Sequence, residues 1–309
     1  MFECIRSEHI PSGVGRRSKK VHVAVLGAAA LMAATNQPAA ADACATTWLN
    51  ANGKSICVKP ADTFKDCDVC PEMVVLPPGE FQMGSPDDEA GRTSEEAPRH
   101  VARIGYTLAV AKFEATFAEW DACVADGGCK HQPRDSGWGR GSQPVINVSW
   151  DDITSQYLPW LSRRTGQSYR LLTETEWEYA ARAGSSGPFS TGSTITTQSA
   201  NFDGTSTYAG SPKGEYRKRT LAAGSFPANP FGLHDMHGNV WEWVQDCHAK
   251  SYEGLRSDGS AAPEVPGCQR VMRGGSWIDS PRVLRFAARG RVPANTRFIY
   301  RGFRVARGF

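Results

Sequence analysis

Cysteine is the residue type in this chain with the widest range of possible chemistry, from metal binding to disulfide formation. The sequence contains nine cysteines, and eight remain when Cys4 near the start is set aside. An even number is typical of an exported protein whose thiols are paired. Proximity along the chain suggests the pairs Cys44–Cys57, Cys67–Cys70, Cys123–Cys129 and Cys247–Cys268. Each pair would close a short loop, although sequence alone does not fix the connectivity.

The segment Cys67-Asp-Val-Cys70 is a CxxC motif, which occurs in redox-active proteins and as one half of zinc sites. The sequence contains no second CxxC to complete a zinc site, and no helix pattern begins after Cys70. We therefore favour a structural bridge over the redox and zinc interpretations.

A second group that could bind a metal is His234, Asp235 and His237. The two histidines are three residues apart in a segment without helical periodicity. A catalytic metal here is the weaker interpretation, because the two histidines lie in a loop and no helix holds them at a fixed spacing.

The first 43 residues have the order of a secretory signal peptide. A basic block, Arg16–Lys20, precedes the apolar run Val21–Ala34, and the small residues of Ala41–Ala43 offer a cleavage site. The apolar run is shorter than the about 20 residues of a spanning helix. We expect a periplasmic or secreted protein with no membrane contact after cleavage; a disordered leader or membrane anchor is the alternative.

Composition predicts a folded domain with a sizeable core. The chain has 309 residues, a net charge of +3 and 40% hydrophobic residues, and this near-neutral charge gives no argument for nucleic acid. Residues 44–70 are polar and cysteine-rich, so we expect an extension stapled by disulfides. Residues 71–309 would form one domain, which we expect to be monomeric.

The elements that would position functional residues are concentrated before Gly184. Apolar runs predict strands at 73–76, at 81–83 and within 101–110. Apolar spacing predicts helices over 116–125, from Asp151 or Asp152 to Arg164, and over 173–183, the last opened by a capping box at Thr173. Pro159 should kink the second helix. Beyond Gly184 we expect loops held by side-chain hydrogen bonds, buried tryptophans, disulfides or metal ions.

Several blocks, in order, carry a resemblance to a known family. They are Glu72–Gly84, Glu96–His100, Pro144–Trp150, Tyr169–Arg182, Gly232–Trp243, Arg273–Trp277 and Gly302–Arg304. Together they make the chain resemble the formylglycine-generating enzymes, or sulfatase-modifying factors. The resemblance implies an α+β fold like that of C-type lectins, irregular and loop-rich, with few short helices.

The resemblance also implies two structural calcium sites. The first would use Asn201, the carbonyl of Phe202, Glu215 and the carbonyl of Arg217; Glu215 stands where the family typically has Asp. The second would use Asp235, the carbonyls of Gly238 and Val240, and Glu242. Carboxylate and carbonyl oxygens suit a hard cation such as calcium. The alternative is that Asp235 and Glu242 only form hydrogen bonds within the loop.

The copper chemistry of the family has no matching residues here. Those oxidases bind Cu(I) through two cysteines that follow a Gly-Gly-Ser-aromatic motif, here Gly274–Trp277. Asp279 occupies the first cysteine position, no cysteine occurs after Cys268, and Tyr300 replaces the usual Asn before Gly-Phe-Arg. Cu(I) requires soft thiolate ligands, so we do not expect copper or formylglycine formation.

The remaining groove candidates are Ser276, Trp277, Asp279, Arg285 and Arg289, with Trp241 and Arg273 in the same blocks. Arginine binds carboxylates or carbonyls, and indole rings cover a peptide or a sugar. We therefore expect a module that binds a peptide, protein or glycan. The alternatives are a maturation enzyme of different chemistry, as in the exported relative that matures the pyoverdine chromophore, and a sulfatase-modifying oxidase. The sequence leaves open whether the chain is an enzyme.

Overall fold

A computed structural model describes residue 44, residues 46–49 and residues 55–309. The predicted signal peptide therefore lies outside the described residues. Within the described part of the chain, no helix is both long and apolar enough to cross a membrane.

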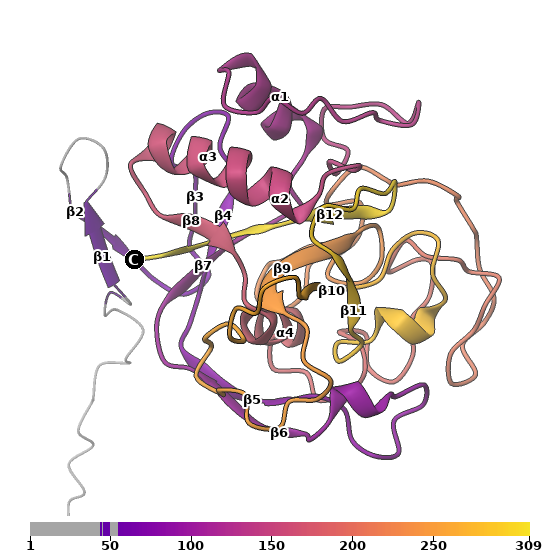
Figure 1. The fold of residues 1–309 in the computed structure, drawn as a ribbon. Helices are drawn as coiled ribbons and strands as arrows, with labels where there is room; N and C mark the ends of the chain where they lie inside the picture. Colours follow the sequence, from indigo (N-terminus) through magenta and orange to yellow (C-terminus); the bar gives the residue numbers. More distant parts are fainter. Residues whose placement is uncertain (1–43, 45, 50–54) are drawn as a thin grey trace, which may run out of the picture. The chain divides into compact units, whose positions relative to one another are not determined.

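The central element is a five-stranded sheet in the order β3-β4-β7-β13-β8 (Figure 1). Its strands are Thr63–Phe64, Met73–Leu76, Leu108–Ala111, Val305–Gly308 and Tyr169–Leu171, in that order across the sheet. Every residue of β4 and β7 is buried, as expected for short, continuous apolar runs. The last strand of the chain, β13, pairs antiparallel with both β7 and β8. The C-terminus is thus built into the middle of the sheet.

A second sheet has the order β11-β10-β9-β12, formed by Gly290–Pro293, Gln269–Arg273, Trp241–Cys247 and Arg301–Phe303. Strand β12 runs parallel to β9, whereas the other pairs are antiparallel. Two hairpins complete the strands, β1 (Thr46–Leu49) with β2 (Ser55–Val58) and β5 (Gly79–Met83) with β6 (His100–Ile104). The single strand predicted within 101–110 is therefore two strands, β6 and β7.

Two of the three predicted helices are confirmed almost to the residue. Helices α1 (Phe117–Ala125) and α4 (Glu174–Arg182) begin after capping boxes at Thr116 and Thr173. In each box the threonine hydroxyl accepts a hydrogen bond from the third helical amide, and the glutamate there reaches back.

The second predicted helix differs from its prediction in two respects. Its cap is Ser149, whose hydroxyl accepts from the Asp152 amide, so Asp151 and Asp152 lie within the helix. The helix runs as α2 (Trp150–Asp152), a π-helical turn (Ile153–Tyr157) and α3 (Leu158–Thr165). The wider π-helical turn lies just before Pro159, whose nitrogen cannot donate a backbone hydrogen bond. The distortion expected at Pro159 therefore takes the form of this wider turn.

Helix α4 is the buried centre of the domain. All nine of its residues are buried, and it contacts β5, β6, β9 and β10. Trp177, Ala180 and Ala181 pack into the apolar core as predicted, while Glu174, Glu176 and Glu178 are buried as well. Buried carboxylates require partners: Glu174 pairs with Arg273 and Arg289, Glu178 with Arg182 and Arg273, and Glu176 with Arg170.

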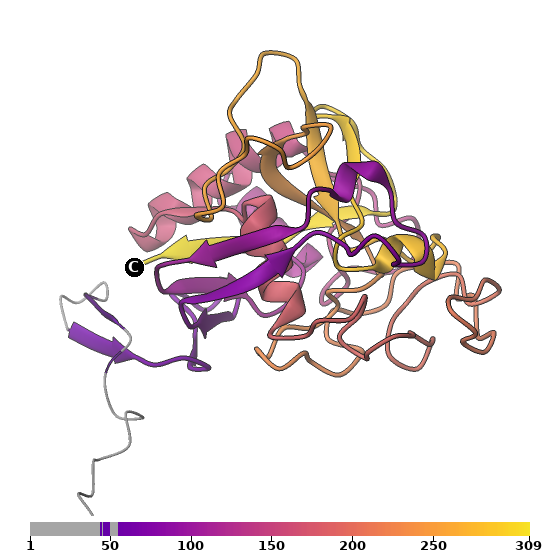
Figure 2. The ribbon, with the colours of Figure 1, turned by 90° about the horizontal axis from the view of Figure 1, so that it is seen from below.

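The segment between α4 and β9 is irregular, as Figure 2 shows for its long loops. Asn229 illustrates how it is held. Its side-chain oxygen accepts from the amides of Phe231 and Leu233, and its nitrogen donates to the carbonyls of Ala180 and Ala181. One side chain thus anchors the loop to the end of α4.

The four disulfides predicted from proximity are all formed: Cys44–Cys57, Cys67–Cys70, Cys123–Cys129 and Cys247–Cys268. The Cys67–Cys70 loop lies between β3 and β4, which are paired in the central sheet. Residues 63–64, assigned above to the N-terminal extension, are therefore part of the domain's sheet.

Candidate functional site

Asp279 is the centre of a small hydrogen-bonded group, which we call the Asp279 site. Its Oδ2 atom accepts a hydrogen bond from the Ser276 hydroxyl at 2.5 Å and another from the Trp241 indole at 2.8 Å. Burial raises the pKa of the Asp279 carboxyl, and the hydrogen bonds from Ser276 and Trp241 oppose that rise. The site therefore holds a half-buried acid, one oxygen of which is held by the Ser276 hydroxyl and the Trp241 indole.

Three aromatic side chains pack on one another beside this site, and we call them the aromatic border: Trp138, Tyr216 and Trp277. The Trp277 ring lies nearly parallel to Tyr216, with centroids 6.3 Å apart, and meets Trp138 edge-on at 5.3 Å. Burial raises the pKa of the Tyr216 hydroxyl, and the negative charges of Asp203 and Asp279 add to this rise.

Apolar side chains are exposed next to the aromatic border. Ile278, Phe298 and Ile299 are exposed by 42%, 42% and 36%. The Trp277 indole donates to the Ile299 carbonyl at 3.3 Å, which ties the two segments together. The surface beside the Asp279 site is thus apolar.

Two consecutive glycines determine the backbone conformation of the turn that leads into the site. Gly274 and Gly275 follow β10 with φ values of +94° and +72°, which other residues rarely adopt. A Cβ on Gly275 would lie 2.7 Å from the Leu284 side chain. The turn directs the chain so that the Trp277 amide donates to the Asn239 carbonyl. The Gly-Gly-Ser-Trp motif therefore sets the position of Ser276 and Trp277.

Arg285 and Arg289 have structural partners rather than a place in the site. Arg285 is 1% exposed and pairs with Glu89 and Glu96. Arg289 donates to both Glu174 oxygens, at 2.7 and 2.8 Å. Neither guanidinium is free to hold a ligand, so these two predicted groove residues form structural salt bridges instead.

Tyr300 and Arg301 lie beside the site. The Tyr300 carbonyl accepts from the Trp241 amide, and the Arg301 guanidinium lies 4.2 Å from the Phe298 ring centroid and 5.3 Å from that of Tyr300. Burial lowers the pKa of Arg301, against the raising effects of Tyr300 and Asp279. Sequence reasoning missed Arg301, Trp138 and Tyr216; the only signal for Arg301 was its position next to Gly-Phe-Arg.

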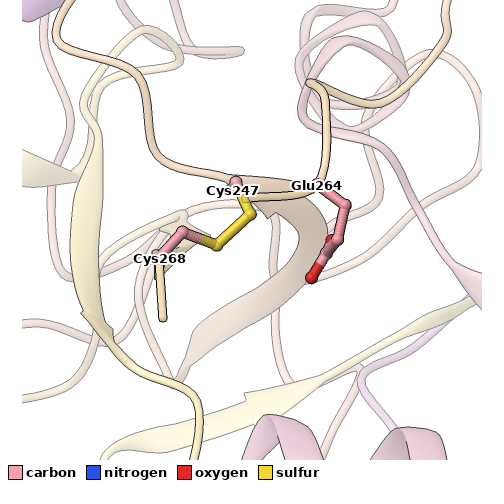
Figure 3. A group of neighbouring side chains, drawn as sticks. All are labelled: Cys247, Glu264 and Cys268. Atoms are coloured by element: carbon pink, nitrogen blue, oxygen red, sulfur yellow. A yellow bond between two sulfur atoms is a disulfide. The ribbon is translucent and has the colours of Figure 1, made fainter. Parts of the chain in front are cut away.

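The copper site of the family does not fit the residues present. The donors at this place are the oxygens of Ser276 and Asp279, which are hard ligands, whereas Cu(I) requires thiolates. Every cysteine that the structure describes is in a disulfide. Among the described residues, one group of His, Cys, Asp or Glu side chains has its ligand atoms close enough together to hold a metal ion: Cys247, Glu264 and Cys268. Figure 3 shows that the two sulfurs of this group are joined in a disulfide beside Glu264. Its sulfurs are oxidised and its carboxylate is ion-paired with Arg270, so this group does not suit a metal.

The histidine group does not form a metal site either. The His237 ring accepts from the Ser190 amide at 3.0 Å and contacts the Leu284 carbonyl at 2.7 Å, so both nitrogens are engaged. Burial lowers the pKa of His237 to about 4. His234 contacts the Phe226 carbonyl at 2.7 Å. Both histidines serve to hold loops together.

The second predicted calcium site lies in a buried cluster of charge. Asp235, Glu242 and Glu114 are at most 8% exposed, and Arg304 is the cation that they share. Burial raises the pKa of Asp235 to about 6 and that of Glu114 well above its usual range, and repulsion from Glu242 adds to both. Glu242 accepts from Arg304 and from the Trp177 indole. Three carboxylates against one guanidinium suit an added cation, although Glu242 would have to share its hydrogen bonds.

The first predicted calcium site fits in part. Asn201 is fully buried, and its side-chain oxygen has no hydrogen-bond partner among the described residues. Its amide nitrogen donates to Arg219 and Asn239, which points the oxygen elsewhere. The Glu215 side chain is 65% exposed and pairs with Arg217 at 3.3 Å. Asn201 therefore suits a cation, whereas Glu215 lies at the surface.

Comparison with known proteins places these features in a family. The family model described as a sulfatase-modifying factor enzyme 1-like domain matches residues 59–309, so the match includes the Cys67–Cys70 loop. The formylglycine-generating enzyme of Thermomonospora curvata is 26% identical over 294 residues, covering 77% of this chain and 94% of that enzyme. The serine/threonine-protein kinase pkn1 of Chlamydia caviae is 35% identical over 174 residues. That match covers 55% of this chain but only 25% of the kinase.

Among solved structures, PvdO from Pseudomonas aeruginosa is 39% identical to this chain, with a TM-score of 0.72. The match covers 82% of this chain and 100% of PvdO. The resemblance inferred from the ordered sequence blocks is thereby confirmed, as is the α+β, loop-rich fold.

Proposed function

The chain belongs to the sulfatase-modifying factor family, and we propose that it is an exported member that binds a peptide at the Asp279 site without copper-dependent cysteine oxidation. The observation that carries this proposal is the hydrogen bonding of Asp279 with Ser276 and Trp241 at the place of the family's copper thiolates. A carboxylate there accepts hydrogen bonds from peptide amides or hydroxyls, which a peptide ligand offers in abundance.

The border of the site favours a peptide over a glycan. A sugar stacks on a free, flat ring face, but Trp277 is only 5% exposed and already packs against Tyr216 and Trp138. The exposed side chains next to it are Ile278, Phe298 and Ile299, which suit the apolar side chains of a peptide.

The oxidase alternative has a direct test. Purified protein incubated with Cu(I) and a Cys-x-Pro-x-Arg peptide should yield no aldehyde by mass spectrometry. Aldehyde formation would refute the proposal that the chain lacks the family's oxidation chemistry.

Substitution of Asp279 should weaken peptide binding by about tenfold or more. Hydrogen bonds to a charged group contribute about 1.5–3 kcal/mol, and about 1.4 kcal/mol is tenfold in affinity. A peptide would be selected on the native protein from a displayed library, and its affinity compared for the native chain and Asp279→Asn. The matched control is Asp258→Asn, an exposed carboxylate paired with Arg256. Equal affinity of Asp279→Asn and the native chain would place binding elsewhere; enrichment of no peptide, with binding on a glycan array, would favour a glycan.

A second candidate is a maturation enzyme that acts on a peptide-linked group. A half-buried acid with a raised pKa next to a hydroxyl can exchange protons with a bound substrate. A time-dependent mass change of the bound peptide that is lost in Ser276→Ala and Asp279→Asn would favour the enzyme over the binding module.

We also propose that calcium stabilises the loops around Asp235 and Asn201. The carboxylate of Asp235, with the carbonyls of Gly238 and Val240, would hold one ion, and Glu114 adds negative charge beside it. The unpartnered oxygen of Asn201 supports a second ion. Calcium would add positive charge to the buried carboxylates that share Arg304.

Removal of calcium should lower the melting temperature by roughly 5–10 °C. A calcium concentration about 100 times the Kd stabilises a folded protein by about 2.7 kcal/mol. Each kcal/mol shifts the melting temperature of a domain of this size by about 2–4 °C. Melting would be followed with calcium and with chelator. Asp235→Asn should reduce the shift, while the exposed Asp258→Asn should retain it. An unchanged melting temperature in chelator would eliminate the proposed ions.

A further inference from the structure

In place of the structural bridge favoured from the sequence, we propose that the Cys67–Cys70 disulfide is redox-active and exchanges with the thiol of a peptide. This inference is independent of the Asp279 site. It starts from the CxxC spacing, which brings two sulfurs together within a single turn in which the Cys70 amide donates to the Cys67 carbonyl.

The two sulfurs differ in access. Cys70 is fully buried in the apolar core, whereas Cys67 is half-buried and the intervening Asp68 and Val69 are exposed. An attacking thiolate can therefore approach Cys67 from the surface. The Cys123–Cys129 disulfide lacks this asymmetry, since its cysteines are 0% and 3% exposed.

A cavity of about 390 Å³ flanks the same loop. Its lining includes Lys65, Val69, Cys70, Phe113 and Glu119. This volume suits a few residues of a peptide, and its apolar side chains give such a peptide a surface to bind. Lys65 in this lining supplies positive charge that favours a thiolate, against the carboxylates of Asp68, Glu72 and Glu119 in the same lining.

The disulfide contributes little that other contacts do not already supply. It joins residues three apart, whereas the other pairs are 6, 13 and 21 apart, and chain-entropy stabilisation is least for the shortest loop. The loop is held independently by Asp66, which accepts from the Tyr169 hydroxyl at 2.6 Å and from Arg307 at 2.7 Å. Reduction can thus occur without unfolding.

The exchange proceeds through a mixed disulfide between the peptide and Cys67. A peptide thiolate attacks the Cys67 Sγ, the sulfur–sulfur bond breaks, and Cys70 leaves as a thiolate that takes up a proton. A second peptide thiol attacks the mixed disulfide and releases Cys67, which is protonated in turn. Two peptide thiols are oxidised to one disulfide, and the protein disulfide is reduced to two thiols.

The test uses glutathione, a peptide thiol, in buffers of stepped reduced-to-oxidised ratio, with alkylation and mass spectrometry of the native full chain. Cys67–Cys70 should be reduced at a ratio at least tenfold lower than Cys123–Cys129, the matched control, while circular dichroism stays unchanged. In Cys70→Ser, a glutathione adduct should accumulate on Cys67.

Two results would overturn the inference: a Cys67–Cys70 disulfide that persists until the protein unfolds, or one that is reduced together with Cys123–Cys129. The titration of the native chain is decisive even if Cys70→Ser fails to fold. Neither result bears on peptide binding at Asp279, which has its own test.

Discussion

Replacement of Arg304 by methionine should destabilise the protein by about 3–5 kcal/mol, the usual cost of removing one partner from a buried ion pair. The Arg304 side chain is completely buried and donates to both carboxylate oxygens of Glu242, at 2.6–2.9 Å. It also donates to the carbonyls of Ala111 and His234. Methionine fills a similar volume but removes the cation from the carboxylate, which keeps only the Trp177 indole as a donor, and removes the Arg304 donor from the two carbonyls.

The measurement is urea unfolding at pH 7, with calcium present, for the native chain and Arg304→Met. The control is Arg103→Met, since the Arg103 side chain is 72% exposed and its pair with Glu80 spans 3.6 Å. Surface pairs contribute about 0–1 kcal/mol, so the control should unfold close to the native midpoint. Equal destabilisation by the two variants would contradict the role assigned to Arg304.

The pH dependence of Arg304→Met, measured in chelator so that Asp235 holds no calcium, gives a second readout. Burial raises the folded-state pKa of Asp235 to about 6, above the value of about 3.9 in an unfolded chain. The folded state then binds the proton more tightly, so this group's contribution to stability falls as pH rises from about 4 to about 6. Without Arg304 the repulsion grows, and the fall should be steeper in the variant than in the native chain.

The sequence predicts local structure well here because local residues determine it. The capping boxes at Thr116 and Thr173 satisfy helix-end amides within three residues of the cap, so their signal is contained in the sequence. The same holds for the four disulfides, since each joins neighbours along the chain. The order of the strands is not local: β13 lies between β7 and β8, and β12 pairs in parallel with β9, pairings that no motif encodes.

In the candidate site, too, some residues could be predicted from local sequence and others could not. Ser276, Trp277 and Asp279 follow a glycine pair and could be identified from the motif. Trp138 and Tyr216 reach Trp277 from distant loops, and their ring contacts depend on the tertiary fold. The arginines beyond the motif could not be assigned from sequence alone, because their glutamate partners lie far away along the chain and decide whether each guanidinium is free.

Arg273 connects the core to the loop that carries the site. It is fully buried, its guanidinium pairs with Glu178 of α4, and it donates to the carbonyls of Phe286 and Ala288 at 2.5 and 2.7 Å. Because Gly274 follows it directly, the same residue holds the loop at both ends. The buried glutamates of α4 therefore act on the Asp279 site through Arg273.

Arg273→Met should cost about 3–5 kcal/mol, because it leaves the buried Glu178 with Arg182 as its remaining cation and removes a donor from two carbonyls. It should also weaken peptide binding under conditions in which the variant is still folded, since the loop between Gly274 and Ala288 loses its anchor. Urea unfolding measures the first effect, and peptide affinity with near-ultraviolet circular dichroism measures the second.

The matched control for Arg273→Met is Arg256→Met, which removes an arginine that is 71% exposed and pairs with Asp258 at the surface. This control should retain native stability and affinity, because an exposed pair is screened by water. If Arg273→Met lost stability but kept full peptide affinity while folded, the loop would be held by other contacts. The Gly274–Gly275 turn and the bond from the Trp277 amide to Asn239 would then be sufficient to position Ser276 and Asp279.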